Sequence, residues 1–438
     1  MKTEFFDLAE QLCRELHSGE VLLSSFSGER SDFVRFNRAL VRQAGSVEQR
    51  YLSLRLVHAR RQASATVSLA GGSDDLTACR KAMHSVRETL LQLPEDPWLL
   101  YSDVPHSTAT ERRGCLPPAD HVIGEVTTAA KGLDFVGFYA GGTVYRGFAN
   151  SLGQRNWHEV DAYNIDWSLH LDGDKAVKNG YAGLDWDPAL FEAKVAGSAR
   201  ELERMKVTPR TLPRGEYRAY LAPPAMEEIT GLLSYGAFSM RARATRQSAL
   251  TRMDDGETLS PQMTIVENTR EGFSPAFQED GYVKPDAVVL IDHGAPASSL
   301  VSPRSAREYN VSPNGASTRE SPEALELSAG DLADEDVLGA LDTGLYISNL
   351  WYLNFSDKPA ARMTGMTRFA TFWVERGRIV APVNPLRFDD TLYRMFGEKL
   401  GRLTRSRELL LSTSTYYERS TASSRLPGAL LESLRFTL

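Results

Sequence analysis

Nine residues carry the most regular pattern in the chain: Tyr163-Asn164-Ile165-Asp166-Trp167-Ser168-Leu169-His170-Leu171. Apolar side chains occupy the odd positions and polar side chains occupy the even ones, as in a strand with one buried face. The apolar face must pack against a core, and the polar face must meet water, a partner or a cavity. The stretch therefore predicts a sheet that is buried on one side.

Further strands and helices are predicted on both sides of this stretch. The elements expected before it are an amphipathic helix ending near residue 17, a meander of extended segments at 21–27, 32–43, 51–58 and 62–69, and a helix at 76–91. After it, Pro188 opens a helix that runs to about Met205, and short strands recur as far as 429–436. Strands with segregated helices predict an α+β fold with mixed, largely antiparallel sheets.

The length of the chain predicts two domains, because 438 residues exceed what one hydrophobic core usually organises. The character of the sequence changes at Pro209 and Pro213. We therefore expect an N-terminal α+β domain at 1–208, with a long loop at 94–120, and a C-terminal α+β domain at 209–438.

Composition excludes several classes of protein. A hydrophobic fraction of 42% is ample for packed cores, and a net charge of -7 disfavours non-specific nucleic-acid binding. Three cysteines without CxxC spacing argue against a disulfide framework and favour a reducing compartment. There is no apolar run of the ~18 residues that a membrane span needs, and no secretory signal pattern. We expect a soluble cytoplasmic protein without membrane contact.

Local motifs for nucleophilic catalysis and phosphate binding are absent from the sequence. There is no GxSxG elbow, although a dispersed triad stays open. The glycine-rich stretch 137–147 fits neither GxGxxG nor a Walker A loop, and we expect its glycines to mark turns and a bulge between strands.

Metal ligands are also poorly placed. His158-Glu159 begins like a zinc-peptidase motif, but no second His follows at the required spacing, and no His occurs after His293 and no Cys after Cys115. Asp172-Gly173-Asp174 fits a turn rather than a calcium loop. Adjacent acids such as Glu227-Glu228 could serve acid–base chemistry, but such pairs usually occupy N-caps, first helical turns or exposed loops.

Several segments together resemble the TldD/PmbA (TldE) family, whose members form two-subunit zinc proteases. They are 145–153 (YRGFANSLG), 277–281 (FQEDG) followed by 288–294, 344–352 (GLYISNLWY), 364–368 (TGMTR), 372–379 (FWVERGRI) and 382–388 (PVNPLRF). In this family the catalytic TldD-type subunit carries HExxxH on a helix, and a Cys near the C-terminus completes the zinc site. The corresponding helix here, within 223–239, contains no His, and 412–425 contains no Cys.

The resemblance therefore implies the TldE/PmbA type, a subunit that binds no metal or other cofactor itself. Such a chain is not catalytic alone. It pairs with a TldD-like HExxxH subunit, which holds the zinc, and the complex processes or degrades unfolded peptides. One departure concerns Phe369-Ala370, where relatives of this subtype commonly have Asp-Gly after the Thr-Arg pair.

Six residues in the matching segments are candidates for substrate binding: Arg146, Asn150, Ser151, Thr364, Gly365 and Arg368. For Asn150, Ser151 and Thr364 the sequence favours stabilisation of turns over the lining of a groove. Two alternative functions stay open: a stand-alone peptide-binding or scaffold protein, and a metal-independent hydrolase with a dispersed site.

Overall fold

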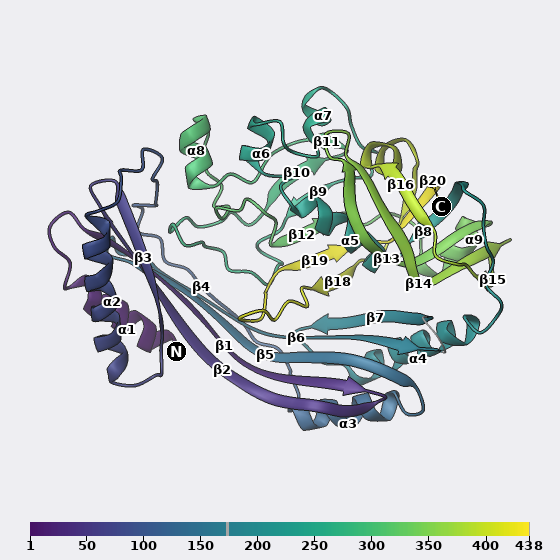
Figure 1. Ribbon diagram of the computed structural model, residues 1–438, viewed down its shortest axis with the longest axis horizontal. Coiled ribbons are helices and arrows are strands. Elements are labelled where there is room, and N and C mark those ends of the chain that lie inside the picture. Colours follow the sequence, from purple (N-terminus) through teal and green to yellow (C-terminus); the bar gives the residue numbers. More distant parts are fainter. Residues whose placement is uncertain (172–174, 438) are drawn as a thin grey trace.

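The computed structural model describes residues 1–171 and 175–437. A seven-stranded sheet organises the N-terminal part of the chain, in the order β3-β2-β1-β5-β6-β4, with β7 also paired to β6 (Figure 1). Neighbouring strands run antiparallel except β4, which lies parallel to β6. The strands are β1 (Val21–Asn37), β2 (Leu40–His58), β3 (Arg61–Ser68), β4 (Ala109–Arg112), β5 (Asp134–Asn150), β6 (Arg155–His170) and β7 (Ala176–Gly183).

Four helices cover the outer face of this sheet: α1 (Lys2–Cys13), α2 (Asp74–Leu90), α3 (Ala119–Ala129) and α4 (Pro188–Arg204). Figure 1 shows α1 and α2 near one end of the long strands and α3 and α4 beneath the other. The apolar face of β6 is buried under α4, since Trp167 lies in a T-shaped contact with Phe191 at 5.6 Å between ring centroids. The half-buried strand that the alternating stretch predicts is confirmed.

The predicted meander is wrong in detail, because β1 and β2 are longer than the segments expected. The segment 32–43 spans the turn between these strands, where Arg38 and Ala39 adopt φ values of 51° and 57°. Such turns normally require Gly, Asn or Asp, and this one carries no such marker. The loop at 94–120 is also shorter than predicted, since it contains β4 and ends in α3. The predicted turn at 172–174 lies outside the described residues.

The prediction that glycines at 137–147 mark turns and a bulge is wrong, because β5 runs through this stretch without a break in its pairing to β1 or β6. Gly147 shows why a glycine is needed inside a strand. A Cβ atom there would lie 2.7 Å from the Cε1 atom of Phe5 and 3.1 Å from the ring of Trp157. The glycine thus leaves room for aromatic side chains packed on the sheet.

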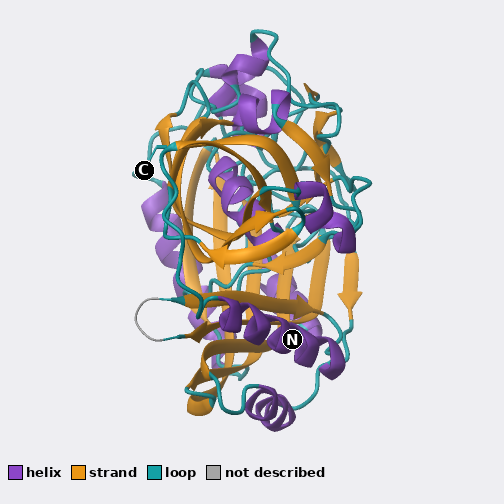
Figure 2. Cartoon of the chain, turned by 90° about the vertical axis from the view of Figure 1, so that its right-hand side faces the viewer, coloured by secondary structure: helices purple, strands orange, loops and turns teal. Residues whose placement is uncertain are grey.

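Two sheets form the C-terminal part. One has the order β11-β10-β9-β12-β19-β18, and the other has the order β13-β8-β20-β16-β14-β15 with β17 on β20. An additional pairing of β13 with β14 closes the second sheet into a ring, and Figure 2 shows its curled strands. The strands are β8 (Gly215–Leu221), β9 (Ile265–Glu267), β10 (Val288–Asp292), β11 (Ala295–Pro296), β12 (Ala324–Leu327), β13 (Gly344–Asp357), β14 (Arg362–Glu375), β15 (Arg378–Pro382), β16 (Arg387–Thr391), β17 (Leu400–Leu403), β18 (Glu408–Leu411), β19 (Ser423–Leu426) and β20 (Ala429–Phe436).

The helices of this part are α5 (Pro223–Ser234), α6 (Met240–Ala244), α7 (Thr251–Asp254), α8 (Pro303–Tyr309) and α9 (Val337–Leu341), with a 3-10 turn at Asp334–Asp336 and a π-helical turn at Arg394–Glu398. Helix α5 packs against both sheets, because Met226 and Ile229 share one buried cluster with Leu325 of β12 and Leu345 of β13. The α+β class is confirmed. Within residues 1–171 and 175–437, no helix combines the length and apolar character needed to cross a bilayer.

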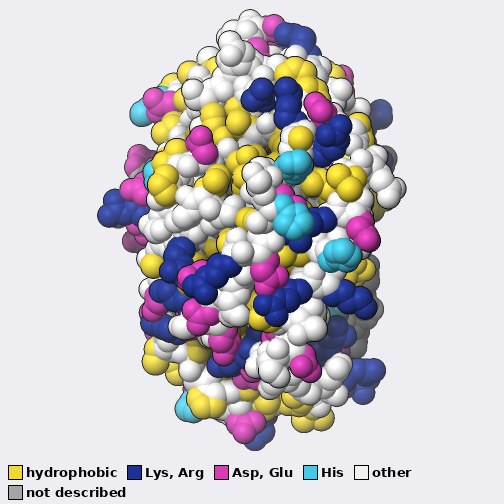
Figure 3. Space-filling model, turned by 90° about the vertical axis from the view of Figure 1, so that its left-hand side faces the viewer, with side chains coloured by type: hydrophobic (Ala, Val, Ile, Leu, Met, Phe, Trp, Pro, Cys, Tyr) yellow, Lys and Arg dark blue, Asp and Glu magenta, His cyan; other side chains and the backbone are white. Residues whose placement is uncertain are grey.

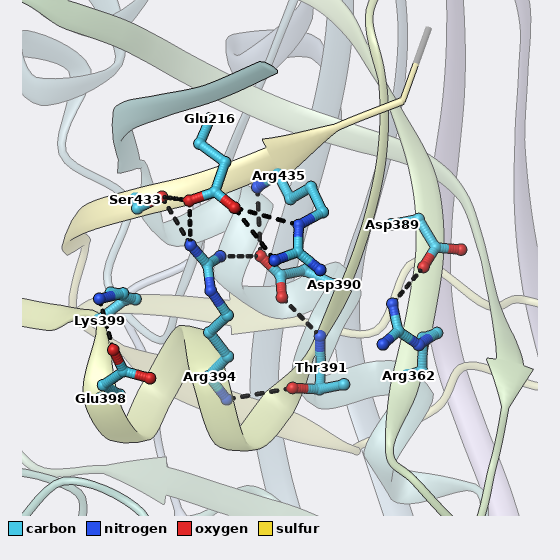
Figure 4. A network of polar contacts seen from close by, with 10 residues as sticks. All are labelled: Glu216, Arg362, Asp389, Asp390, Thr391, Arg394, Glu398, Lys399, Ser433 and Arg435. Carbon is cyan, nitrogen blue, oxygen red and sulfur yellow. Dashed lines mark hydrogen bonds and ion pairs between the residues drawn. The ribbon is translucent and has the colours of Figure 1, made fainter. Parts of the chain in front are cut away.

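A network of ion pairs holds the last strand in place (Figure 4). Arg394 of the π-helical turn pairs with Asp390 of β16 and with Glu216 of β8, and Glu216 also pairs with Arg435 of β20 at 3.0 Å. Asp390 is 1% exposed, and its carboxylate also accepts a hydrogen bond from the Arg435 backbone at 3.1 Å. The network joins β8 to three elements that lie far along the chain from it: β16, the π-helical turn and β20.

The loop between β18 and β19 connects the two parts of the molecule through Arg419, which is 3% exposed. Its guanidinium donates to the backbone carbonyls of Ala162 at 2.8 Å and Gly142 at 3.2 Å, and its backbone N–H donates to the Glu29 carboxylate at 3.1 Å. Burial lowers the pKa of Arg419 to about 10, and the nearby Glu29 carboxylate opposes that shift. These hydrogen bonds therefore attach the C-terminal part to strands β5 and β6 of the N-terminal sheet.

Candidate functional site

A cleft of about 840 Å³ lies between the N-terminal sheet and the C-terminal part. Strands β6 and β7 line it on one side, and α5, β13, β18 and β19 line it on the others. Clefts of this size that separate two structural units are common ligand sites. Figure 1 shows β18 of the C-terminal part directly above β7 of the N-terminal sheet.

The floor of the cleft is the polar face of the alternating strand. Asn164 and Asp166 of β6 line it, together with the residues of β7 that pair with them, Ala182 and Gly180. Because these two partners are small, the cleft reaches down to the sheet. The sequence left water, a partner or a cavity as possible surroundings of this polar face. In the structure the face lines a cavity.

Helix α5 carries carboxylates into the cleft. The helix begins at Pro223, where a missing N–H costs nothing in the first turn, and its buried face includes Ala225 and Ile229. Successive residues lie about 100° apart around a helix, so Glu227 and Glu228 fall beside that face and line the cleft. The prediction of an N-cap, first turn or loop for this acidic pair is wrong, since it lies in the second turn of α5.

Acidic side chains outnumber basic ones in the lining of the cleft. Burial among protein atoms, and then the charge of Glu228, raise the pKa of Glu227 to about 7. Burial also raises the pKa of Glu228 and of Asp166. The Lys178 ammonium of β7 opposes the shift at all three carboxyls. One lysine thus faces three acids.

An aromatic wall borders the cleft on β13. Trp351 is 41% exposed and Tyr352 is 81% exposed, and both line the cleft. The Arg368 guanidinium of β14 lies 5.4 Å from the Trp351 ring centroid, and the Phe369 ring lies 6.1 Å from it. Tyr352 and Phe369 have φ values of 57° and 63°, which bulky residues rarely adopt. Strained backbone of this kind tends to occur at functional sites.

The six predicted substrate residues form two separate groups in the structure. Arg146, on β5, pairs with Glu418 at 3.1 Å and donates to the carbonyl of Tyr145 at 2.8 Å. Asn150 ends β5, and its Oδ1 atom accepts from the backbone N–H groups of Leu152 and Gln154, each at 3.0 Å. Ser151 follows in the turn and accepts from the Leu22 N–H at 3.2 Å. The expected turn-stabilising role fits Asn150 and Ser151.

The other three candidates lie on β14. The prediction of a turn for Thr364 is wrong, because it lies inside this strand, donates to the Phe388 carbonyl at 2.9 Å and accepts from Arg387 at 3.0 Å. Gly365 packs directly against Phe388 and Leu353. Only Arg368 approaches the cleft, through its contact with Trp351. A role in substrate binding stays a prediction for all six.

The residues that line the cleft were mostly not singled out by sequence reasoning. The alternation of β6 places Asn164 and Asp166 on its polar face, which was the available signal. Lys178 and Trp351 come from strands that meet this face only through tertiary packing. No local pattern marks them as neighbours.

Zinc does not fit the side chains of this cleft. Structural and catalytic zinc sites use imidazole and thiolate ligands, with carboxylates as a minority, whereas α5 offers adjacent carboxylates. Among the residues that the structure describes, no three His, Cys, Asp or Glu side chains are grouped to hold a metal ion. No chemical step is therefore assigned to a metal in this chain.

These features define an α+β protein with an acidic, aromatic-walled cleft between two structural parts. Residues 214–437 match the family model of the PmbA/TldA metallopeptidase C-terminal domain. That match covers more than half of the 438 residues, and the chain belongs to the PmbA/TldD family of metallopeptidase-like proteins. No curated protein matches the sequence.

Solved structures share the whole fold at low sequence identity. TldE from Thermococcus kodakarensis superposes with a TM-score of 0.80 at 14% identity, covering 99% of this chain and 100% of that one. A protein from Thermotoga maritima, described as a candidate modulator of a DNA gyrase, gives 0.79 at 14% identity with complete coverage of both chains. A protein from Bacteroides thetaiotaomicron with a similar description gives 0.74 at 14% identity, covering 100% of this chain and 98% of that one. The TldD/TldE fold is thereby confirmed.

Proposed function

We propose that this chain is the metal-free subunit of a two-chain zinc metalloprotease that processes or degrades unfolded peptides. A TldD-like partner with a HExxxH helix supplies the zinc, and this chain shapes the substrate chamber. The observation that carries the proposal is helix α5. It is the helix that the resemblance aligns with HExxxH, it lines the cleft, and it presents Glu227 and Glu228 with no His.

The edges of two sheets support a role in holding extended peptides. Strand β7 pairs with β6 and β18 pairs with β19, so each ends its own sheet, and both line the cleft. A strand at a sheet edge presents backbone N–H and C=O groups that can pair with an added peptide. Such pairing is tolerant of sequence, as a protein acting on unfolded peptides requires.

The compartment we propose is the cytoplasm. Cys13, Cys79 and Cys115 are free thiols in the structure. Burial raises the pKa of the Cys13 and Cys79 thiols to about 11, so both are unreactive at neutral pH. Cell fractionation with a soluble cytoplasmic marker tests this assignment.

The decisive experiment combines elemental analysis with reconstitution. The chain purified alone should contain less than one zinc per molecule. Mixed with a HExxxH-bearing relative encoded in the same genome, it should give peptidase activity that a chelator abolishes and that neither chain shows alone. Equal activity of the relative without this chain would contradict the subunit role. Chelator-resistant peptidase activity of the single chain would instead favour the metal-independent hydrolase.

A further inference from the structure

We propose that the acidic side of the cleft binds an alkylammonium group, carried by a lysine side chain or by the amino terminus of a peptide. The proposal deepens the proposed function, on which it rests for the peptide nature of the ligand. The ammonium site itself belongs to this chain alone and can be tested without a partner.

Unpaired carboxylates are the first observation. Glu227 and Glu228 form no hydrogen bond or ion pair through their side chains with any described residue, although both line the cleft. Two acids with more deeply buried side chains elsewhere in the molecule are paired with arginine: Glu20 with Arg87 at 2.8 Å and Asp280 with Arg55. A cation is therefore the group that this side of the cleft lacks.

The charges around Glu227 favour a ligand cation. Burial is the largest cause of the raised pKa of Glu227, and Glu228 on the same helix and Glu408 of β18 raise it further. The Lys178 ammonium of β7 lowers this pKa, and Asp166 of β6 lines the same cleft. A bound ammonium ion would favour the ionised carboxylate. By linkage, affinity for the ammonium should increase as the pH rises through about 7.

An unsatisfied amide is the second, independent observation. Asn164 lines the cleft and is 5% exposed, and its Nδ2 atom has no hydrogen-bond partner among the described residues. The Oγ atom of Ser424, another lining residue, has none either. Buried polar groups in native proteins are almost always paired. A peptide supplies carbonyl acceptors for such donors next to its ammonium groups.

The aromatic wall suits the apolar stem that carries an ammonium. Trp351 and Tyr352 line the cleft, and the Trp351 ring already takes the Arg368 guanidinium at 5.4 Å. Cations and alkyl stems both pack favourably on such rings. Among the described residues, no three His, Cys, Asp or Glu side chains are grouped to hold a metal ion. The combination therefore favours an organic cation over a metal ion.

Isothermal titration of the full chain tests the proposal directly. The lysine arm uses Nα-acetyl-lysine methylamide, the amino-terminal arm uses leucine methylamide, and the neutral reference is the lysine compound acetylated at Nε. We expect one of the two amines to bind at one site per chain, about tenfold or more tighter than the neutral reference. For the lysine compound, whose ammonium stays protonated, the affinity should be higher at about pH 8 than at about pH 5.5. Leucine methylamide is compared at about pH 7, because an α-amino group loses its proton at about pH 7.7–8.0.

Variants locate the site. Glu227→Gln combined with Glu228→Gln should weaken binding of the preferred amine about tenfold or more. Glu335→Gln, which removes an exposed carboxylate outside the cleft, should leave it unchanged. Equal binding of the amines and the neutral reference, no binding of either amine, or full affinity in the double variant would each overturn the proposal. The titration contains no partner chain, so its results would stand even if the proposed role as a protease subunit proved wrong.

Discussion

The Arg146 guanidinium lies 3.1 Å from the Glu418 carboxylate, joining β5 of the N-terminal sheet to the loop that precedes β19. Arg146 is 18% exposed at its side chain, and burial lowers its pKa while Glu418 is the strongest influence opposing that shift. A residue expected to contact substrate thus contributes to the junction between the two parts of the molecule.

Removing the carboxylate from this pair should destabilise the protein. Glu418→Gln leaves a largely buried guanidinium without its counter-charge, and we expect a loss of about 1–3 kcal/mol in the free energy of unfolding. Urea denaturation measures it. The matched control is Glu203→Gln, which breaks the exposed pair with Lys206 and should cost about 0–0.5 kcal/mol. An equal, small effect of both variants would refute a structural role for the pair.

The raised pKa of Glu227 predicts that replacing its carboxyl group by an amide stabilises the protein in a pH-dependent way. In the folded protein its pKa lies near 7, above the ordinary value of 4.5, so the folded state holds the proton more tightly. The stability that this provides is complete below about pH 4.5 and is lost as the pH rises through about 7. Glu227→Gln should therefore raise the melting temperature relative to the parent at about pH 8 and have a smaller effect near pH 5. A pH-independent difference would contradict the shift.

Close packing at Gly365 predicts that even a methyl group is too large there. A Cβ atom would lie 2.7 Å from Leu353 Cδ1 and 2.8 Å from Phe388 Cε1. Gly365→Ala should lose about 1–3 kcal/mol of stability through overpacking. Gly124→Ala, in helix α3 with no atom within 4 Å of the added Cβ, should instead gain about 0.5–1 kcal/mol. Thermal unfolding of both variants measures the opposite signs, and a gain at Gly365 would be incompatible with the packing.

Backbone strain at Tyr352 predicts that a substitution relieving it increases stability and weakens ligand binding in the cleft. Its side chain is 81% exposed while its φ is 57°, so Tyr352→Asn removes little packing and introduces a residue that tolerates this conformation. We expect a gain of about 0.5–1 kcal/mol in stability, with weaker binding of ligands in the cleft. Tyr416→Asn is the control, since Tyr416 is 79% exposed without a positive φ. Equal stability changes in both variants would remove strain as the cause.

The fold was largely predictable where side chains alternate or repeat in a simple way. The pattern from Tyr163 to Leu171 identified a strand and both of its faces, and Asp187-Pro188 identified the start of α4, where the Asp187 carboxylate accepts from Ala189 N–H at 2.9 Å. The turn at Arg38 and Ala39 was not predictable, because neither residue type favours positive φ.

The site was harder to predict, because it is assembled from separate elements. Glu227 and Glu228 look like ordinary surface acids in the sequence, and only the tertiary fold places α5 in the same cleft as Asp166 and Lys178. The glycines of β5 misled for a related reason. Gly147 leaves room for Phe5 and Trp157, while Gly137 and Gly141 lie against Phe135 and Tyr139, and a one-dimensional pattern does not reveal these contacts.

The anchoring of Arg419 bears on how the protein is made. When the strands of the N-terminal sheet have left the ribosome, Glu418 and Arg419 have not yet been translated. Arg146 and Glu29 therefore emerge before the residues that pair with them in the folded protein. Strand β8 likewise pairs with β20, the last strand among the described residues. Nascent chains therefore reach their final state only after residues 418–436 have been translated, and products that terminate before them would be natural targets for quality control.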